Sequence, residues 1–126
     1  MESSFELLPE PFLINPSLPI YEQFVGAIRE RIVSGIIPPG ARLPSVRDLA
    51  AGRGVNPTTA ARTYQELERM GLIVTYRGQG TFVTREESII AEARRAIIRQ
   101  AVRQFKDTAR SLGLTAEQML QFDKEE

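Results

Sequence analysis

Apolar residues recur at helical spacing over residues 19–34, and this pattern predicts the first helix of the chain. Pro19 suits a helix start and Gly35 suits the position just after a helix end. The following sequence, IIPPGARLP, contains two prolines and a glycine and breaks any helix. The apolar stripe consists of Ile20, Phe24, Val25, Ile28 and Ile32.

Two short helices with a glycine-containing turn between them are predicted next. Ser45 opens a sequence that resembles a capping box, and Gly54 suits the end of that helix. Asn56 as N-cap and Pro57 at the first helical position predict a third helix, which ends at Gly71. Two helices joined by a short turn with glycine are typical of a helix-turn-helix. The apolar positions of the third helix are Ala60, Tyr64, Leu67 and Met70.

A β-hairpin is predicted after the third helix. The runs 72–76 and 81–84 are rich in β-branched and aromatic residues, and the sequence RGQG separates them. The order of helix, helix-turn-helix and hairpin is that of a winged helix-turn-helix. The predicted fold class is therefore mainly α with a small β-hairpin, a winged helix-turn-helix followed by a two-helix tail.

The tail is predicted to join two copies of the chain. A long helix is expected over 86–111, and Thr115 with Gln118 forms a capping box for a last short helix. The short helix can cover only part of the apolar stripe of the long one, so the same helix of a second chain is the simplest partner for the rest. The expected dimerisation residues are Ile90, Ala93, Ile97, Ala101 and Phe105.

Composition narrows the classes of function. The 126 residues are 42% hydrophobic and 25% charged and include no cysteine or histidine. Disulfides and thiolate chemistry are excluded, and the commonest general base and metal ligand are missing. We expect no enzyme, no metal and no cofactor. No apolar run approaches the length of a membrane span, and the acidic start MESSFELLPE is unlike a signal peptide, so the expected location is the cytoplasm without a membrane partner.

The formal net charge of zero hides an uneven distribution. Residues 1–20 carry a charge of −3 and residues 86–126 carry −1, whereas residues 21–85 carry nine basic and five acidic residues, or +4. All nine bases in that middle segment are arginine, whose rigid fork suits phosphates and guanine edges. The charge alone is compatible with a solvated face and gains meaning only from its place on the fold.

The basic and small polar residues fall where a winged helix-turn-helix meets DNA. The third helix fits the major groove, its N-terminal end offers backbone N–H groups to phosphate, and the hairpin tip can reach the backbone or the minor groove. The candidate DNA-binding residues are Arg47, Asn56, Thr58, Thr59, Arg62, Arg77, Gly78 and Gln79. We expect three segments: an N-terminal arm over 1–17 held by Phe12 and Ile14, a DNA-binding domain over 18–85 and a dimerisation tail over 86–126.

The stretches PGARLPSVRDLA, VNPTT, YQELERMGLI and GQGTFV occur together, in this order and spacing, within residues 19–84. By these stretches, residues 19–84 resemble the DNA-binding domain of the GntR family of bacterial transcription regulators. The short remainder and the sequence NPTTAARTYQELE are similar to the YtrA-type branch, which carries a two-helix tail. Other branches place arginine where this chain has Pro57 and Ala61, so their base contacts do not define this operator.

The resemblance implies a sequence-specific regulator of double-stranded DNA, most simply a repressor. Because the tail is expected to form a two-fold homodimer, the operator should be pseudo-palindromic. It carries DNA contact over to Arg47, Thr58, Thr59, Arg62, Arg77, Gly78 and Gln79. A small-molecule effector of unknown identity would have to bind at the tail or its junction with the winged domain. Two other classes stay open at this point: a winged-helix module for protein–protein contact, and an RNA-binding winged helix.

Overall fold

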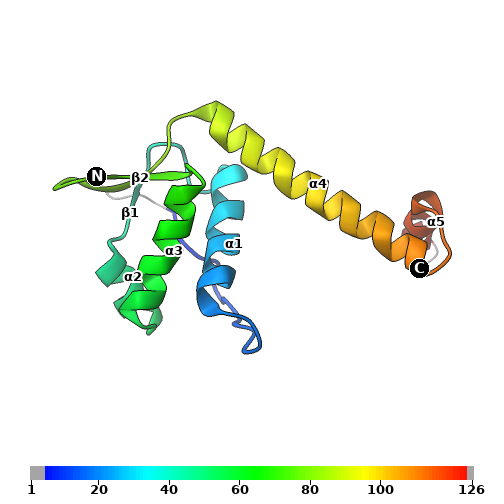
Figure 1. Ribbon diagram of the computed structural model, residues 1–126, viewed down its shortest axis with the longest axis horizontal. Helices are drawn as coiled ribbons and strands as arrows, with labels where there is room; N and C mark the ends of the chain where they lie inside the picture. Colours follow the sequence, from blue (N-terminus) through cyan, green and yellow to red (C-terminus); the bar gives the residue numbers. More distant parts are fainter. Residues whose placement is uncertain (1–4, 125–126) are drawn as a thin grey trace. The chain divides into compact units, whose positions relative to one another are not determined.

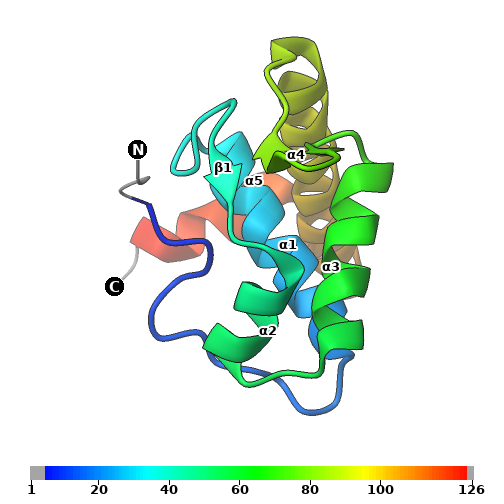
Figure 2. The same cartoon turned by 90° about the vertical axis from the view of Figure 1, so that its left-hand side faces the viewer.

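Three helices in the N-terminal half of the chain pack around one apolar core. The computed structural model describes residues 5–124. Helices α1 (Ile20–Val33), α2 (Val46–Arg53) and α3 (Pro57–Arg69) match the predicted elements to within about two residues at each end. Helices α1 and α3 lie side by side, and α2 packs against α3 (Figures 1 and 2). The core side chains of these helices include Phe24, Ile28, Ile32, Leu49, Ala60 and Leu67.

Local capping explains why the helix-turn-helix begins and ends where it does. The Ser45 hydroxyl accepts a hydrogen bond of 3.0 Å from the backbone N–H of Asp48. Gly54 ends α2 in the left-handed conformation, with φ of +64°. The Asn56 side chain accepts 2.8 Å from the backbone N–H of Thr58, directly before Pro57 begins α3. The predicted N-caps Ser45 and Asn56 are confirmed.

The wing is a three-stranded antiparallel sheet. Strands β1 (Arg42–Leu43), β2 (Ile73–Tyr76) and β3 (Gly80–Val83) lie in the order β1-β3-β2. The predicted hairpin of β2 and β3 is confirmed. Strand β1 was not predicted, because its residues were interpreted only as part of a helix-breaking segment. Two residues give no periodic signal, and this strand exists because it pairs with β3, with Arg42 opposite Phe82.

The N-terminal arm is held by apolar contacts that the sequence predicted only in part. The Phe12 and Phe24 rings lie 5.5 Å apart between centroids, which confirms Phe12 as an anchor. Ile14 is exposed, so its predicted anchoring role is wrong. Leu8 takes that role, with a fully buried side chain in the first half of the arm. Residues 1–4 of the predicted arm lie outside the described residues.

Polar contacts tie the same arm to α1 and α2. The Arg31 Nε donates to the backbone carbonyl of Glu6 at 2.9 Å. Arg53 forms an ion pair with Glu10 at 2.8 Å. The arm, blue in Figure 2, runs past α2 before it enters α1. The folded winged unit therefore extends N-terminally of residue 18.

We expect Leu8→Ala to destabilise the winged unit by about 2–4 kcal/mol, because a large buried side chain is removed and a cavity remains. Urea unfolding followed by circular dichroism measures this loss. Leu13→Ala is the matched control, since Leu13 is 85% exposed and its replacement should cost less than about 0.5 kcal/mol. Equal stability of the two variants would show that the arm does not belong to the folded unit.

The C-terminal part forms a second compact unit that begins at residue 93. Helix α4 (Glu87–Ser111) starts in the first unit and continues into the second, where α5 (Ala116–Gln121) and a short 3-10 helix (Phe122–Lys124) follow. The predicted capping box between Thr115 and Gln118 is confirmed, with both hydrogen bonds present. The backbone N–H of Leu114 donates a hydrogen bond to the carbonyl of Ala109. The Ala109 side chain is buried within this unit.

Candidate nucleic-acid interface

Helix α3 buries one face and leaves a polar face to solvent. Ala60, Thr63, Tyr64 and Leu67 are buried against the core. At 100° per residue, the opposite face carries a separate set of side chains. Two of them, Thr58 and Arg62, were predicted as site residues, and the exposed Gln65 was missed although helical periodicity places it there. The full set on that face is Thr58, Arg62, Gln65 and Arg69, all exposed.

Tyr64 fixes α3 relative to the start of α2. Its hydroxyl donates a 2.6 Å hydrogen bond to the backbone carbonyl of Pro44, which precedes Ser45. Burial, with a smaller contribution from the Asp48 carboxylate, raises the pKa of Tyr64 far above its usual value. The phenol therefore stays protonated as a donor. This contact holds the two helices of the helix-turn-helix in register.

The predicted residues at the start of α3 differ in what they can offer a ligand. The Asn56 side chain is engaged in capping, as described above. The Thr59 side chain is half-buried, and its backbone carbonyl accepts from the Thr63 hydroxyl at 2.9 Å. Thr58 is exposed one residue into the helix. Among these three residues, Thr58 is the most accessible group for a phosphate or base.

Arg47 and the wing tip add exposed cations and amides from neighbouring elements. Arg47 is the second residue of α2, and Arg77 begins the turn between β2 and β3. Within residues 5–124 neither arginine has a hydrogen bond or ion pair to another side chain. Gly78 has φ of +79°, and both Gly78 and Gln79 are exposed. The tip can therefore approach a nucleic-acid strand closely with its backbone.

Arg42 is a wing arginine that the sequence analysis did not single out. Its guanidinium carbon lies 6.0 Å from the centroid of the Phe82 ring. A Cβ at position 80 would come within 2.9 Å of the Arg42 Nε. Because Gly80 has no Cβ, the Arg42 side chain can lie across this position. Because β1 was not predicted, nothing in the sequence placed Arg42 beside the wing. Arg42, Ser45 and Thr81 line a groove of about 600 Å³.

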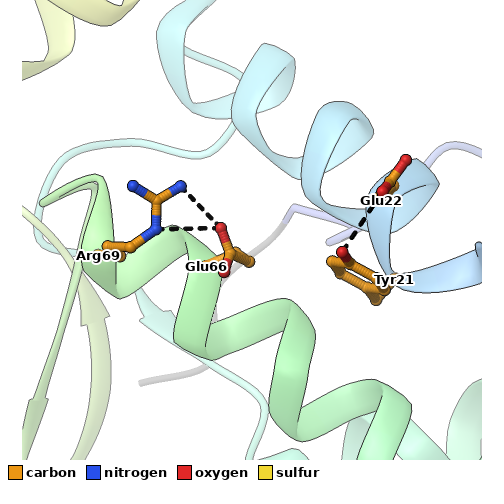
Figure 3. A network of polar contacts seen from close by, with 4 residues as sticks. All are labelled: Tyr21, Glu22, Glu66 and Arg69. Carbon is orange, nitrogen blue, oxygen red and sulfur yellow. Dashed lines mark hydrogen bonds and ion pairs between the residues drawn. The ribbon is translucent and has the colours of Figure 1, made fainter.

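The exposed arginines of α3 have partners inside the protein. Arg69 donates two hydrogen bonds to one Glu66 oxygen, at 3.1 and 2.8 Å (Figure 3). The hydrogen bond from Arg69 lowers the pKa of Glu66 most, and the charge of Arg62 adds to the effect. The Arg62 guanidinium lies over the ring of Tyr21 from α1, 4.1 Å from its centroid. Arg62 is thus held in place on the solvent face of the helix.

The described residues hold neither a candidate metal-ion cluster nor a helix that could span a membrane. No group of three or more acidic, cysteine or histidine side chains that could hold a metal ion occurs within residues 5–124. Among the helices of the same range, none has the length and apolar character needed to cross a membrane.

The arrangement of α1, α2, α3 and the wing defines a winged helix-turn-helix protein. Residues 20–83 match the family model described as "Bacterial regulatory proteins, gntR family". The chain therefore belongs to the gntR family of bacterial regulatory proteins. The family resemblance and the fold class expected from the sequence are both confirmed.

Two curated relatives from Bacillus subtilis (strain 168) cover most of both chains. The uncharacterized HTH-type transcriptional regulator YhcF is 43% identical over 83% of this chain and 87% of its own length. The HTH-type transcriptional repressor YtrA is 37% identical over 86% of this chain and 85% of its own length. Both are transcription regulators, which agrees with the expectation of a non-enzymatic protein.

Solved structures show the same architecture. A GntR family transcriptional regulator from Listeria monocytogenes is 36% identical and covers 90% of this chain and 99% of its own, with a TM-score of 0.83. The AraR DNA-binding domain in complex with operator ORX1 is 30% identical and covers 66% of this chain and 100% of its own, with a TM-score of 0.51. The winged fold is therefore one that a similar domain uses on operator DNA.

Proposed function

We propose that this chain is a sequence-specific, homodimeric repressor that binds a pseudo-palindromic DNA operator. One observation carries the proposal: the solvent face of α3 presents Thr58, Arg62 and Gln65, flanked by the exposed Arg47 of α2. These are side chains that read base edges and phosphates in a major groove. The operator complex of the similar AraR domain and the name of the YtrA repressor support the assignment. The site of action is then the DNA of the bacterial cytoplasm.

Within this interface, we assign two kinds of contact. Arg47, Arg62 and Gln65 read base edges, because arginine pairs with guanine and glutamine with adenine. Thr58, the backbone at the start of α3 and the wing residues Arg77, Gly78 and Gln79 grip the phosphate backbone. Asn56 and Thr59 shape the helix start. In this proposal the first unit, which contains residues 18–85, binds DNA, and the second unit, from residue 93 onward, forms the dimer.

The dimer proposal rests on apolar surface that α4 leaves exposed in the second unit. Ile98 is 52% and Val102 45% exposed, one turn apart on the helix. The expected stripe residues Ala93, Ile97, Ala101 and Phe105 lie on the same half of the helix. Ile90, by contrast, is only 6% exposed and belongs to the first unit. Because its side chain is not accessible to a second chain, we no longer include Ile90 among the proposed dimerisation residues. Leu112, Leu120 and Phe122 are further exposed large apolar side chains of the second unit.

The test of this function is selection of duplexes from a random pool by the full-length chain. Fluorescence anisotropy at several salt concentrations then gives affinity and salt dependence. We expect enrichment of an inverted repeat and affinity that falls steeply with salt. Enrichment of no sequence, with weak binding equal on all duplexes, would contradict a sequence-specific regulator. Preference for single-stranded or double-stranded RNA would favour the RNA-binding class instead.

We expect Arg77→Ala to make the plot of log affinity against log salt less steep by about one unit per half-site. The reason is that a phosphate no longer contacted by the protein keeps its condensed counterion, about 0.9 per phosphate, which binding then does not release. The melting temperature should stay unchanged, because the side chain is exposed at the wing tip. Arg110→Ala removes the same charge from the second unit, where Arg110 pairs with Asp107, and should leave the slope as it is. Identical slopes for all three proteins would exclude the wing contact.

A further inference from the structure

The contact between Tyr21 and Arg62 joins the first helix to the recognition helix. Tyr21 is the second residue of α1, and the Arg62 guanidinium carbon lies over its ring, 4.1 Å from the ring centroid. The Tyr21 hydroxyl donates to the Glu22 Oε2 at 3.3 Å, as Figure 3 shows. Glu66, one turn after Arg62 on α3, adds a carboxylate on the same side. The guanidinium therefore has a ring on one face and a negative charge nearby.

A contact of this kind is compatible with base reading by Arg62. Stacking uses the flat face of a guanidinium, whereas base recognition uses the N–H groups along its edge. A bidentate pair with guanine O6 and N7 needs only two of those five donors. The same arginine can therefore keep its ring contact and read a base. Arg62 is exposed, as such a role requires.

The stack also reduces what DNA binding costs in side-chain freedom. A solvent-exposed arginine samples many rotamers, and fixing them on binding weakens affinity. A side chain that is already ordered in the free protein avoids much of that loss.

The Tyr21 side chain is not part of the core. It is half-buried, whereas the buried residues of α1 are Phe24, Val25, Ile28, Ile32 and Val33.

We propose that Tyr21 is a positioning residue for sequence readout, and that its ring pre-orders Arg62 for one base position in each half-site. The inference rests on the proposed function of the chain. Tyr21 acts through Arg62 and touches no base in this assignment. It is an aromatic residue of α1, an element that contributes no reading side chain to the proposed interface.

The experiment measures the affinity of four variants for the duplex selected by the full-length chain. They are Tyr21→Leu, Tyr21→Phe, Arg62→Ala and the double variant that carries both Tyr21→Leu and Arg62→Ala. The stack is worth about 2- to 5-fold in affinity per half-site, so Tyr21→Leu should weaken binding of the dimer to that duplex by about 4- to 25-fold. It should leave binding to unrelated duplexes unchanged. Tyr21→Phe keeps the ring and should bind within about 2-fold of the original. In the Arg62→Ala background, Tyr21→Leu should have no further effect.

A measurement without DNA keeps the inference falsifiable. The Arg62 Nε proton should show an upfield ring-current shift in the NMR spectrum of the free protein, kept in Tyr21→Phe and lost in Tyr21→Leu. An absent shift in the unchanged protein, or equal losses from Tyr21→Leu with and without Arg62, would overturn the positioning role. Failure of the unchanged chain to select any duplex would instead overturn the proposed function, and the NMR result would still stand on its own.

Discussion

We expect Val102→Asp or Ile98→Asp to convert the proposed dimer to monomers and to weaken binding to the full operator by at least about 100-fold. Both side chains are among the most exposed large apolar residues of α4, and a buried carboxylate between two apolar helices has no partner to offset its desolvation. Two half-sites bound by a joined pair gain about 10²- to 10⁴-fold over separate binding. Sedimentation velocity measures the mass, and fluorescence anisotropy measures the affinity.

Ala96→Asp is the matched control for these two variants. It adds one carboxylate at an exposed position of the same helix, but about 60° outside the apolar arc. We expect it to remain dimeric with unchanged operator binding.

A chain truncated after Glu92 keeps the buried Ile90 and should be a folded monomer. A dimeric truncated chain would place the interface in the first unit and contradict the tail assignment.

The helices and the hairpin could be predicted because each has its own local signal. Asn56 followed by Pro57 fixes the start of α3 with two neighbouring residues, and the structure shows the predicted hydrogen bond. Strand β1 has no such signal, because only its pairing with β3 makes Arg42 and Leu43 a strand. Leu8 was missed for the same reason: the segment around it is interrupted by Pro9 and Pro11 and shows no period, and the burial of Leu8 depends on the helices that it meets.

The candidate site divides along the same line. Residues on one helix or one turn could be placed from spacing alone, as Thr58, Arg62 and Arg77 were. Contacts between elements could not, so the position of Arg42 beside Phe82 and the stack of Arg62 on Tyr21 appear only in the folded chain. Helical periodicity was sufficient to find Gln65, which lies on the same face as Arg62. Burial of Ile90 depends on how α4 enters the first unit, which a stripe of apolar residues does not reveal.

Replacing Arg47 with alanine will reduce specific binding by about 30-fold or more, because a bidentate arginine–guanine pair is worth about 1–3 kcal/mol and a dimer makes two. The loss should be confined to duplexes that carry the contacted base. Changing that base in both half-sites should cost the unchanged protein the same amount and cost the variant nothing further.

Arg47→Lys separates base reading from phosphate binding at this position. Lysine keeps the charge but lacks the planar fork, so it should lose discrimination at the contacted base and keep the salt slope of the unchanged protein. A phosphate contact gives the opposite pattern: lysine then restores binding, while alanine weakens all duplexes equally and lowers the salt slope by about one unit per half-site. That pattern would move Arg47 from readout to backbone positioning and leave Arg62 and Gln65 of α3 to read the operator.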